Sequence, residues 1–165
     1  MSEEKHFKVL FLCTGNSARS ILAEYLMRKT DPRRFESFSA GSHPKGQVHP
    51  LALRLLKEVY KIDASAARSK SWDEYQGVHF DFVITVCDNA RESCPIWPGQ
   101  PIVAHWGIPD PADFEGPEAG ALEGLDLLRH VVDADHVVTE IGEDGPRHQS
   151  DVAGADDADV HGRRS

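Results

Sequence analysis

The sequence predicts a single α/β domain in which helices cover both faces of a parallel β-sheet. Two patterns lead to this prediction. Short apolar runs of strand length alternate along the chain with segments whose apolar residues recur at helical spacing. Strands that alternate with helices are typical of a parallel sheet wrapped by helices. The length of 165 residues suits one domain with one core.

The elements can be placed in order along the chain. Strands are expected at residues 8–13, 35–40, 80–87 and 101–106. A helix is expected from Ser17 to about residue 29, directly after the first strand. A second helix should start at Pro50 and run to about residue 61, because Leu53, Leu56 and Tyr60 lie at core spacing.

The last third of the chain differs in composition. Residues 117–134 fit one more helix, with leucines and valines at helical spacing. From Gly142 onward the chain is acidic and rich in glycine, and such a segment buries too little apolar surface to offset its ordering entropy. We therefore expect a catalytic domain at residues 1–141 and a disordered tail at residues 142–165.

Charge and cysteine content exclude several classes of protein. The 18 Lys and Arg residues against 27 Asp and Glu give a net charge of −9, which argues against general binding to nucleic acid or to anionic membranes. No signal peptide or membrane span is visible, so the expected location is the cytoplasm, where thiols stay reduced. Three cysteines cannot all pair within one chain, so we do not expect a set of permanent structural disulfides.

The first chemical motif follows the first strand: Cys13-Thr14-Gly15-Asn16-Ser17-Ala18-Arg19-Ser20. We call residues 13–19 the anion loop. A cysteine that ends a buried strand, a glycine that permits a tight turn and a following helix together allow successive backbone N–H groups to bind a tetrahedral oxyanion. Arg19 would grip two of its oxygens. This positive environment would keep Cys13 as a thiolate nucleophile, with the hydroxyls of Ser17 and Ser20 bonded to its sulfur. The alternative is a buried cysteine followed by an ordinary helix N-cap at Ser17.

A second motif, His105-Trp106-Gly107-Ile108-Pro109-Asp110-Pro111, follows the fourth strand. Substrates of open parallel sheets bind beyond the carboxyl ends of the strands. Asp110 is therefore expected near Cys13, where it could protonate a leaving oxygen as a general acid. An Asp-Pro turn is the alternative. His105 and Trp106 are given no role.

The third motif places Cys87 after the third strand and Cys94 seven residues later. Two cysteines at this spacing without a second pair make a poor zinc site. A redox relay fits better: a thiol beside Cys13 could attack an adduct on that sulfur, and a third thiol on a loop could then take over the disulfide. Simple burial is the alternative, and it suits Cys87 better than Cys94.

These residues resemble a known family, the thioredoxin-coupled arsenate reductases, which share the fold of the low-molecular-weight protein tyrosine phosphatases. The resemblance covers roughly residues 8–112. It rests on residues 13–24, Ser39-Ala40-Gly41, residues 68–72, residues 85–88 with Cys94-Pro95, and residues 105–107 with Asp110-Pro111.

The resemblance implies a flavodoxin-like, doubly wound sheet of four parallel strands and a reaction that reduces arsenate to arsenite. It also implies roles by motif position. Cys13 would be the nucleophile on arsenic, Cys87 the thiol that displaces arsenite, and Cys94 the thiol that resolves the first disulfide. Arg19 and the loop amides would bind the oxyanion, and Asp110 would be the acid.

The sequence departs from the family at two places. Some relatives hold a potassium ion near the anion loop, and Asn16, Glu24 and Ser39 fit that pattern. The further carboxylate is missing, with Lys70-Ser71 in its place, so we expect Lys70 to supply a fixed positive charge and no metal to bind. The second departure is the C-terminal segment, where relatives usually have a basic amphipathic helix.

Two other functions compete with arsenate reduction. A protein tyrosine phosphatase would use Cys13, Arg19 and Asp110 through a phosphocysteine, but it needs no further cysteine pair. A non-catalytic module that only senses oxidants would need no oxyanion site. We expect a monomer that acts on a small oxyanion, binds no cofactor, nucleic acid or membrane, and is recycled by thioredoxin or a low-molecular-weight thiol.

Overall fold

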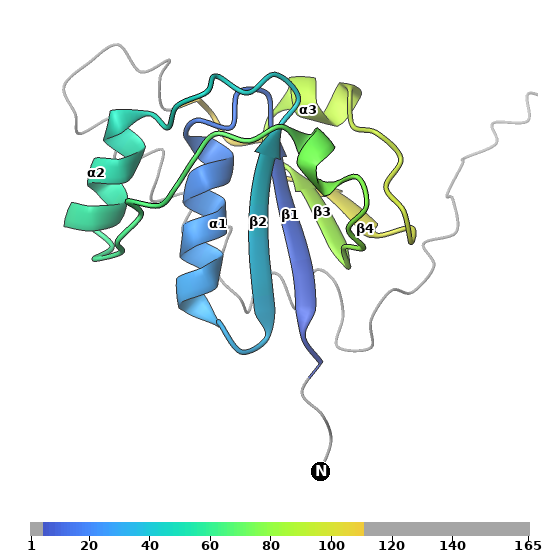
Figure 1. Cartoon of the computed structure of the whole chain (residues 1–165), viewed down its shortest axis with the longest axis horizontal. Coiled ribbons are helices and arrows are strands. Elements are labelled where there is room, and N and C mark those ends of the chain that lie inside the picture. The colour runs from blue at the N-terminus through green and yellow to red at the C-terminus, as the bar shows by residue number, and fades with distance from the viewer. Residues whose placement is uncertain (1–4, 111–165) are drawn as a thin grey trace, which may run out of the picture.

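A computed structural model of the chain describes residues 5–110, and it contains the predicted four-stranded parallel sheet. The strands are β1 (Phe7–Cys13), β2 (Phe35–Gly41), β3 (Phe82–Thr85) and β4 (Ile102–His105). The helices are α1 (Arg19–Thr30), α2 (Pro50–Glu58), the 3₁₀ helix η1 (Trp72–Tyr75) and α3 (Asp88–Glu92) (Figure 1).

The strand order β2-β1-β3-β4 determines where a site can form. The chain leaves β1 toward β2 on one side and later returns to β3 on the other. The connections therefore diverge at the carboxyl ends of β1 and β3, and ligands bind at such a switch point in open parallel sheets. The anion loop follows β1, and Cys87 lies two residues beyond β3.

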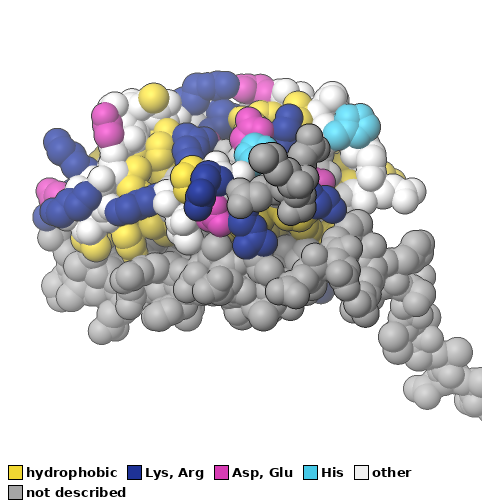
Figure 2. Space-filling view, turned by 90° about the horizontal axis from the view of Figure 1, so that it is seen from below, with side chains coloured by type: hydrophobic (Ala, Val, Ile, Leu, Met, Phe, Trp, Pro, Cys, Tyr) yellow, Lys and Arg dark blue, Asp and Glu magenta, His cyan; other side chains and the backbone are white. Residues whose placement is uncertain are grey.

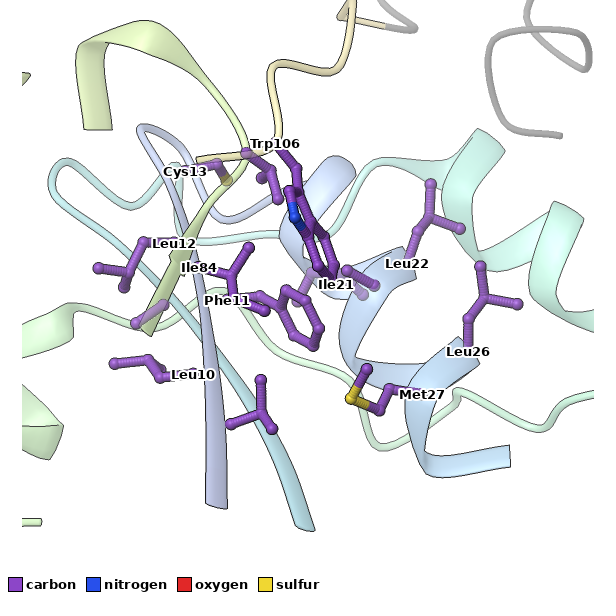
Figure 3. Close-up of a cluster of buried hydrophobic side chains, with 14 of the residues drawn as sticks. Leu10, Phe11, Leu12, Cys13, Ile21, Leu22, Leu26, Met27, Ile84 and Trp106 are labelled. Atoms are coloured by element: carbon purple, nitrogen blue, oxygen red, sulfur yellow. The ribbon is translucent and has the colours of Figure 1, made fainter. Parts of the chain in front are cut away.

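The core lies on both faces of the sheet. On one face Phe11 and Trp106 fill the space between the strands and α1, with ring centroids 6.0 Å apart (Figure 3). Side chains alternate along a strand, so Leu10 points to the other face, as does its register partner Phe38. That face carries an aromatic cluster made of Phe38, Tyr75, Phe80 and Trp97.

Helix α1 is buried along two full turns, from Ser20 to Met27, because it lies between the sheet and α2. Helix α2 begins at Pro50 as predicted, but it ends three residues earlier than expected. Lys61 has a positive φ of 56°, so the chain has left helical geometry there. The α2 residues fully buried are Ala52, Leu55 and Leu56, whereas Leu53 is only partly buried.

Other elements also differ from the sequence predictions, and β4 is one residue shorter at each end than expected. Helix α1 begins at Arg19 and not at Ser17, because residues 14–18 belong to the anion loop. Strand β3 is four residues long, so Cys87 lies beyond it, and the segment after Cys87, expected as a loop, forms α3. The predicted helix at residues 117–134 and the expected tail lie outside the described residues. Within residues 5–110, no helix has the length and apolar character needed to cross a membrane.

Candidate active site

The anion loop is held from outside by the segment at residues 42–49. Backbone N–H groups of that segment donate to the carbonyls of Cys13 (3.2 Å), Thr14 (2.8 Å), Gly15 (2.9 Å) and Ser17 (2.8 Å). In a planar trans peptide the next residue's N–H points away from the carbonyl. The N–H groups of residues 14, 15, 16 and 18 therefore point inward, as an oxyanion site requires.

Cys13 lies at the start of this loop and is buried, with 3% of the residue exposed. Its sulfur accepts a hydrogen bond from the backbone N–H of Asn16 at 3.1 Å, and it shares one with Ser20 Oγ at 2.9 Å. Ser20 is placed as predicted. The backbone carbonyl of Ser17 instead accepts a hydrogen bond from the His49 N–H.

Asn16 joins the loop to the rest of the domain. It is fully buried and has a φ of 42°, a conformation that asparagine tolerates better than most residues. Its side-chain amide donates to Ser20 Oγ at 2.8 Å and accepts from the Lys70 backbone N–H at 2.7 Å. Asn16, assigned from sequence only to oxyanion binding, therefore also orients the group that contacts the Cys13 sulfur.

Beneath the loop lies a buried ion pair. Lys70 Nζ is 3.6 Å from Glu24 Oε2 and donates to Ser39 Oγ at 3.3 Å and to the Arg68 carbonyl at 2.9 Å. Ser39 also donates to Glu24, and Arg28 donates to the other oxygen of Glu24 at 2.8 Å. Burial lowers the pKa of Lys70, and the Glu24 charge opposes that effect. Lys70 Nζ thus lies within reach of both Glu24 and Ser39.

Arg19 and Asp110 meet at the mouth of the loop. Arg19 Nη2 is 3.0 Å from Asp110 Oδ2, and Nη1 donates to the Ile108 carbonyl at 3.0 Å. The two side chains are 16% and 29% exposed, so both are accessible to solvent in part. The predicted acid and the predicted oxyanion clamp are therefore in contact. The Asp110 carboxylate thus accepts from an Arg19 N–H group that could otherwise donate to an oxyanion.

Cys87 lies beside the loop, as predicted. It is 6% exposed, and its sulfur is 3.4 Å from Thr14 Oγ1 in a hydrogen bond. Cys87 is the N-cap of α3, and Cys94 lies two residues beyond the end of that helix. All three cysteines are free thiols. Within residues 5–110 no three His, Cys, Asp or Glu side chains are grouped as metal ligands.

His105 has structural contacts that the sequence reasoning did not assign. Its Nδ1 is 2.8 Å from Thr85 Oγ1 and its Nε2 is 3.1 Å from Asp88 Oδ1. The imidazole thus connects the ends of β3 and β4 to the first turn of α3. The sequence signal for these contacts was that His105 lies at the end of one predicted strand and Thr85 near the end of the preceding strand. The charges around His105 in the sequence do not distinguish it from a surface histidine.

Comparison with known proteins agrees with this arrangement. Residues 8–141 match the family model described as low molecular weight phosphotyrosine protein phosphatase. An arsenate reductase of Halalkalibacterium halodurans is 39% identical over 108 residues, which are 66% of this chain and 76% of the relative. One of Brevibacillus brevis is 41% identical over 110 residues, 67% of this chain and 81% of the relative.

Solved structures have the same fold. The arsenate reductase of Archaeoglobus fulgidus superposes with a TM-score of 0.65 at 29% identity, over 78% of this chain and 98% of that one. A thioredoxin-dependent arsenate reductase of Corynebacterium glutamicum gives 0.62 at 28% identity, over 78% of this chain and 59% of that one. With its anion loop, strand order and these matches, the chain belongs to the low molecular weight phosphotyrosine protein phosphatase family.

Proposed function

We propose that this protein reduces arsenate to arsenite through three successive thiols, Cys13, Cys87 and Cys94. The observation that supports this proposal best is the hydrogen bond between Cys87 Sγ and Thr14 Oγ1 at 3.4 Å. Thr14 is the neighbour of Cys13, so a second thiol lies at the edge of the oxyanion site. A phosphatase has no use for a thiol there. The curated relatives named above are arsenate reductases, which supports the same substrate.

The chemistry begins with the Cys13 thiolate. Its sulfur attacks arsenic in the oxyanion held by the loop amides and Arg19, and one oxygen leaves as water after protonation by Asp110. The Cys87 thiolate then attacks the Cys13 sulfur. An S–S bond forms and the S–As bond breaks, with its electron pair passing to arsenic. Arsenic(V) becomes arsenic(III), and the two thiols become a disulfide.

Cys94 would regenerate Cys13. Its thiolate attacks Cys87, forms the Cys87–Cys94 bond and releases Cys13 as a thiolate. Helix α3 now lies between these cysteines. A disulfide needs the two Cα atoms within roughly 7 Å of each other, and we expect the segment that contains α3 to rearrange so that the two sulfurs can meet. The hydrogen bond that His105 Nε2 donates to the Asp88 carboxylate breaks if the first turn of α3 moves.

An external dithiol would reduce the Cys87–Cys94 disulfide. Thioredoxin fits this role because one structural relative is described as thioredoxin-dependent. Cys94 is partly exposed and its neighbours Ser93, Pro95 and Ile96 are exposed, which favours the approach of a protein reductant.

Hydrolysis of aryl phosphates is a second activity that the same residues support. It requires the Cys13 thiolate, the amide loop with Arg19, and the acid Asp110, which lies 3.0 Å from Arg19. It does not require Cys87 or Cys94, because water completes the reaction.

Serine variants of the two relay cysteines test the proposal. Cys87→Ser should lose arsenate reduction, because no thiol can displace arsenite from Cys13, and it should retain aryl-phosphate hydrolysis. Cys94→Ser should release one arsenite per enzyme and stop with a Cys13–Cys87 disulfide. Arsenite release, aryl-phosphate turnover and peptide mapping of disulfides measure these outcomes.

The wild-type protein provides the control. Treated with arsenate without reductant, it should accumulate the Cys87–Cys94 disulfide. Three free thiols after that treatment would contradict the relay and would favour the phosphatase function.

A further inference from the structure

A lysine side chain lies against the anion loop. Lys45 belongs to the segment between β2 and α2, which passes beside the loop (Figure 1). Its backbone N–H donates to the Gly15 carbonyl at 2.9 Å. A Cβ built on Gly15 would lie 3.2 Å from both Cγ and Cε of Lys45, and 3.3 Å from its Cδ. The stem of Lys45 therefore runs along Gly15, where the absence of a side chain leaves room for it.

This packing places the Lys45 ammonium at the rim of the oxyanion site. Nζ is one C–N bond, about 1.45 Å, beyond Cε, so it lies within about 5 Å of the position that a Gly15 Cβ would take. The N–H of Gly15 is one of those that point into the loop. An anion oxygen bonded to it is therefore at most about 10 Å from the ammonium, which is one Debye length at an ionic strength of about 0.1 M.

Lys45 is exposed, and its charge is available to a ligand. None of the Asp and Glu side chains within residues 5–110 forms an ion pair with it. By contrast, Arg19 is 3.0 Å from Asp110, and Lys70 is 3.6 Å from Glu24. Those two cations are thus partly compensated by carboxylates, whereas Lys45 adds positive charge to the rim of the loop.

The backbone around Lys45 is held in place, which fixes the base of its side chain. The Gly46 N–H donates to Ser69 Oγ at 3.2 Å, and that hydroxyl donates to the Gly15 carbonyl at 3.1 Å. Gly46 has a φ of 83°, so the chain turns directly after Lys45. Only the end of the side chain is therefore free to move. A fixed base reduces the entropy that is lost when the ammonium meets an anion.

We propose that Lys45 supplies a second cation, besides Arg19, for the bound oxyanion and makes the site favour doubly charged oxyanions over singly charged ones. The inference rests on the proposed function, because it concerns the same oxyanion site. Coulomb attraction to an ammonium is proportional to the charge of the anion, so a dianion gains twice as much as a monoanion. Lys45 contacts none of the reacting thiols and contributes to substrate binding and selectivity.

Two tetrahedral anions that differ in charge test the proposal. At neutral pH sulfate carries two charges and perchlorate one. Their dissociation constants can be measured on the full chain from the N–H resonances of the anion loop, at an ionic strength of about 0.1 M. Lys45→Met keeps the length of the stem and removes the charge. The dissociation constant should rise about tenfold for sulfate and only about threefold for perchlorate. Lys45→Arg should restore both values to within about twofold of the wild type.

Lys57→Met is the matched control, because it removes the same charge from an exposed lysine in the last turn of α2 and should change neither dissociation constant. Salt provides a second control. At an ionic strength of about 1 M the Debye length is about 3 Å, and the defect of Lys45→Met toward sulfate should fall below about twofold. A loss caused by altered packing on Gly15 would persist in salt. Equal factors for the two anions, an unchanged sulfate constant or a defect that persists in salt would overturn the proposal.

A kinetic measurement separates this inference from the proposed reaction. In Lys45→Met the KM for arsenate should rise about tenfold with kcat unchanged, because Lys45 attracts the substrate and the transition state equally. A lower kcat at an unchanged KM would contradict the proposal. If the wild-type chain does not reduce arsenate, the proposed function fails, whereas the sulfate and perchlorate constants still decide the role of Lys45.

Discussion

At the scale of single residues, the reactivity of Cys13 depends on a chain of buried hydrogen bonds. The Cys13 sulfur is bonded to Ser20, Ser20 to the Asn16 amide, and Asn16 to the backbone of Lys70. Lys70 in turn is paired with Glu24. Each hydrogen bond in this series provides a partner for a polar group that would otherwise be buried without one. The nucleophile is therefore positioned by a residue 57 places away in the sequence.

The Lys70–Glu24 pair should be essential to stability because both side chains are buried, at 7% and 8% exposure. Lys70→Met removes the buried ammonium and leaves Glu24 with Arg28 and Ser39 as partners, so it should lower the free energy of unfolding by about 1–3 kcal/mol. Arg68→Met is the matched control. It removes an ion pair with Glu74 whose side chains are 62% and 41% exposed, and it should cost about 0–1 kcal/mol. Urea unfolding of both variants at neutral pH measures the difference.

The same pair has a pH signature. Since burial lowers the pKa of Lys70 below its ordinary value of 10.5, the unfolded chain holds more protons than the folded chain between those two values. In that window Lys70 makes the free energy of unfolding rise with pH, and this contribution is absent from Lys70→Met. Equal slopes in the two proteins would show that Lys70 is not the group responsible.

At the scale of elements, the anion loop is confined by the end of β2 and by the segment that follows it. Gly41, the last residue of β2, is paired in register with Cys13. A Cβ at Gly41 would lie 2.6 Å from the Thr14 carbonyl oxygen and 2.9 Å from the Asn16 nitrogen, closer than such atoms can approach. The strand can reach the loop only because this residue has no side chain.

Gly41→Ala should therefore distort the loop itself. The contacts are with backbone atoms that cannot rotate away, so we expect a loss of about 3 kcal/mol in unfolding free energy and weaker binding of inorganic phosphate. Gly77→Ala is the control, because a Cβ there meets nothing within 4 Å, and its effect should stay within about 0.5 kcal/mol. Unfolding midpoints and phosphate titrations check both. Normal phosphate binding by Gly41→Ala would mean that the loop tolerates the displacement.

At the scale of the whole molecule, the acidity of the chain is not spread evenly. Residues 5–110 contain 14 Lys and Arg against 11 Asp and Glu, whereas residues 111–165 contain 4 against 14. Lys and Arg side chains are spread over the described surface at the amino end of the sheet, away from the anion loop (Figure 2). The net charge of −9 is thus a poor guide to the electrostatics around the site, which belongs to a part of the chain with a small positive balance.

Removal of residues 142–165 should leave the chemistry intact. Every proposed site residue lies at or before Asp110, and the family match ends at residue 141. The catalytic efficiency toward arsenate should stay within a factor of about two of the full chain, as for changes remote from a site. Steady-state arsenate reduction, with circular dichroism as the folding control, checks this. Loss of activity in a folded truncated protein would assign the removed segment a part in the site.

Local patterns were sufficient for most of the fold and for the residues that carry the chemistry. The apolar run of β1, the turn and helix after it and the alternation of strands with helices predicted the parallel sheet and the anion loop. Ser20 and Asp110 were also placed near Cys13 and Arg19 from sequence, since strand ends meet at one edge of a parallel sheet. Each of these predictions rests on a local pattern combined with the general rule that the strand ends of a parallel sheet lie at one edge.

Tertiary structure alone decided the features that depend on distant partners. The helix α3 was expected as a loop because its five residues carry little periodicity, and it is held by contacts with His105. The bond from Lys70 to Asn16 and the buried indole N–H of Trp97, which has no acceptor among residues 5–110, likewise depend on which surfaces pack together. Packing determines burial, and burial determines whether a polar group must find a partner or stays unpaired. No local pattern in the sequence contains that information.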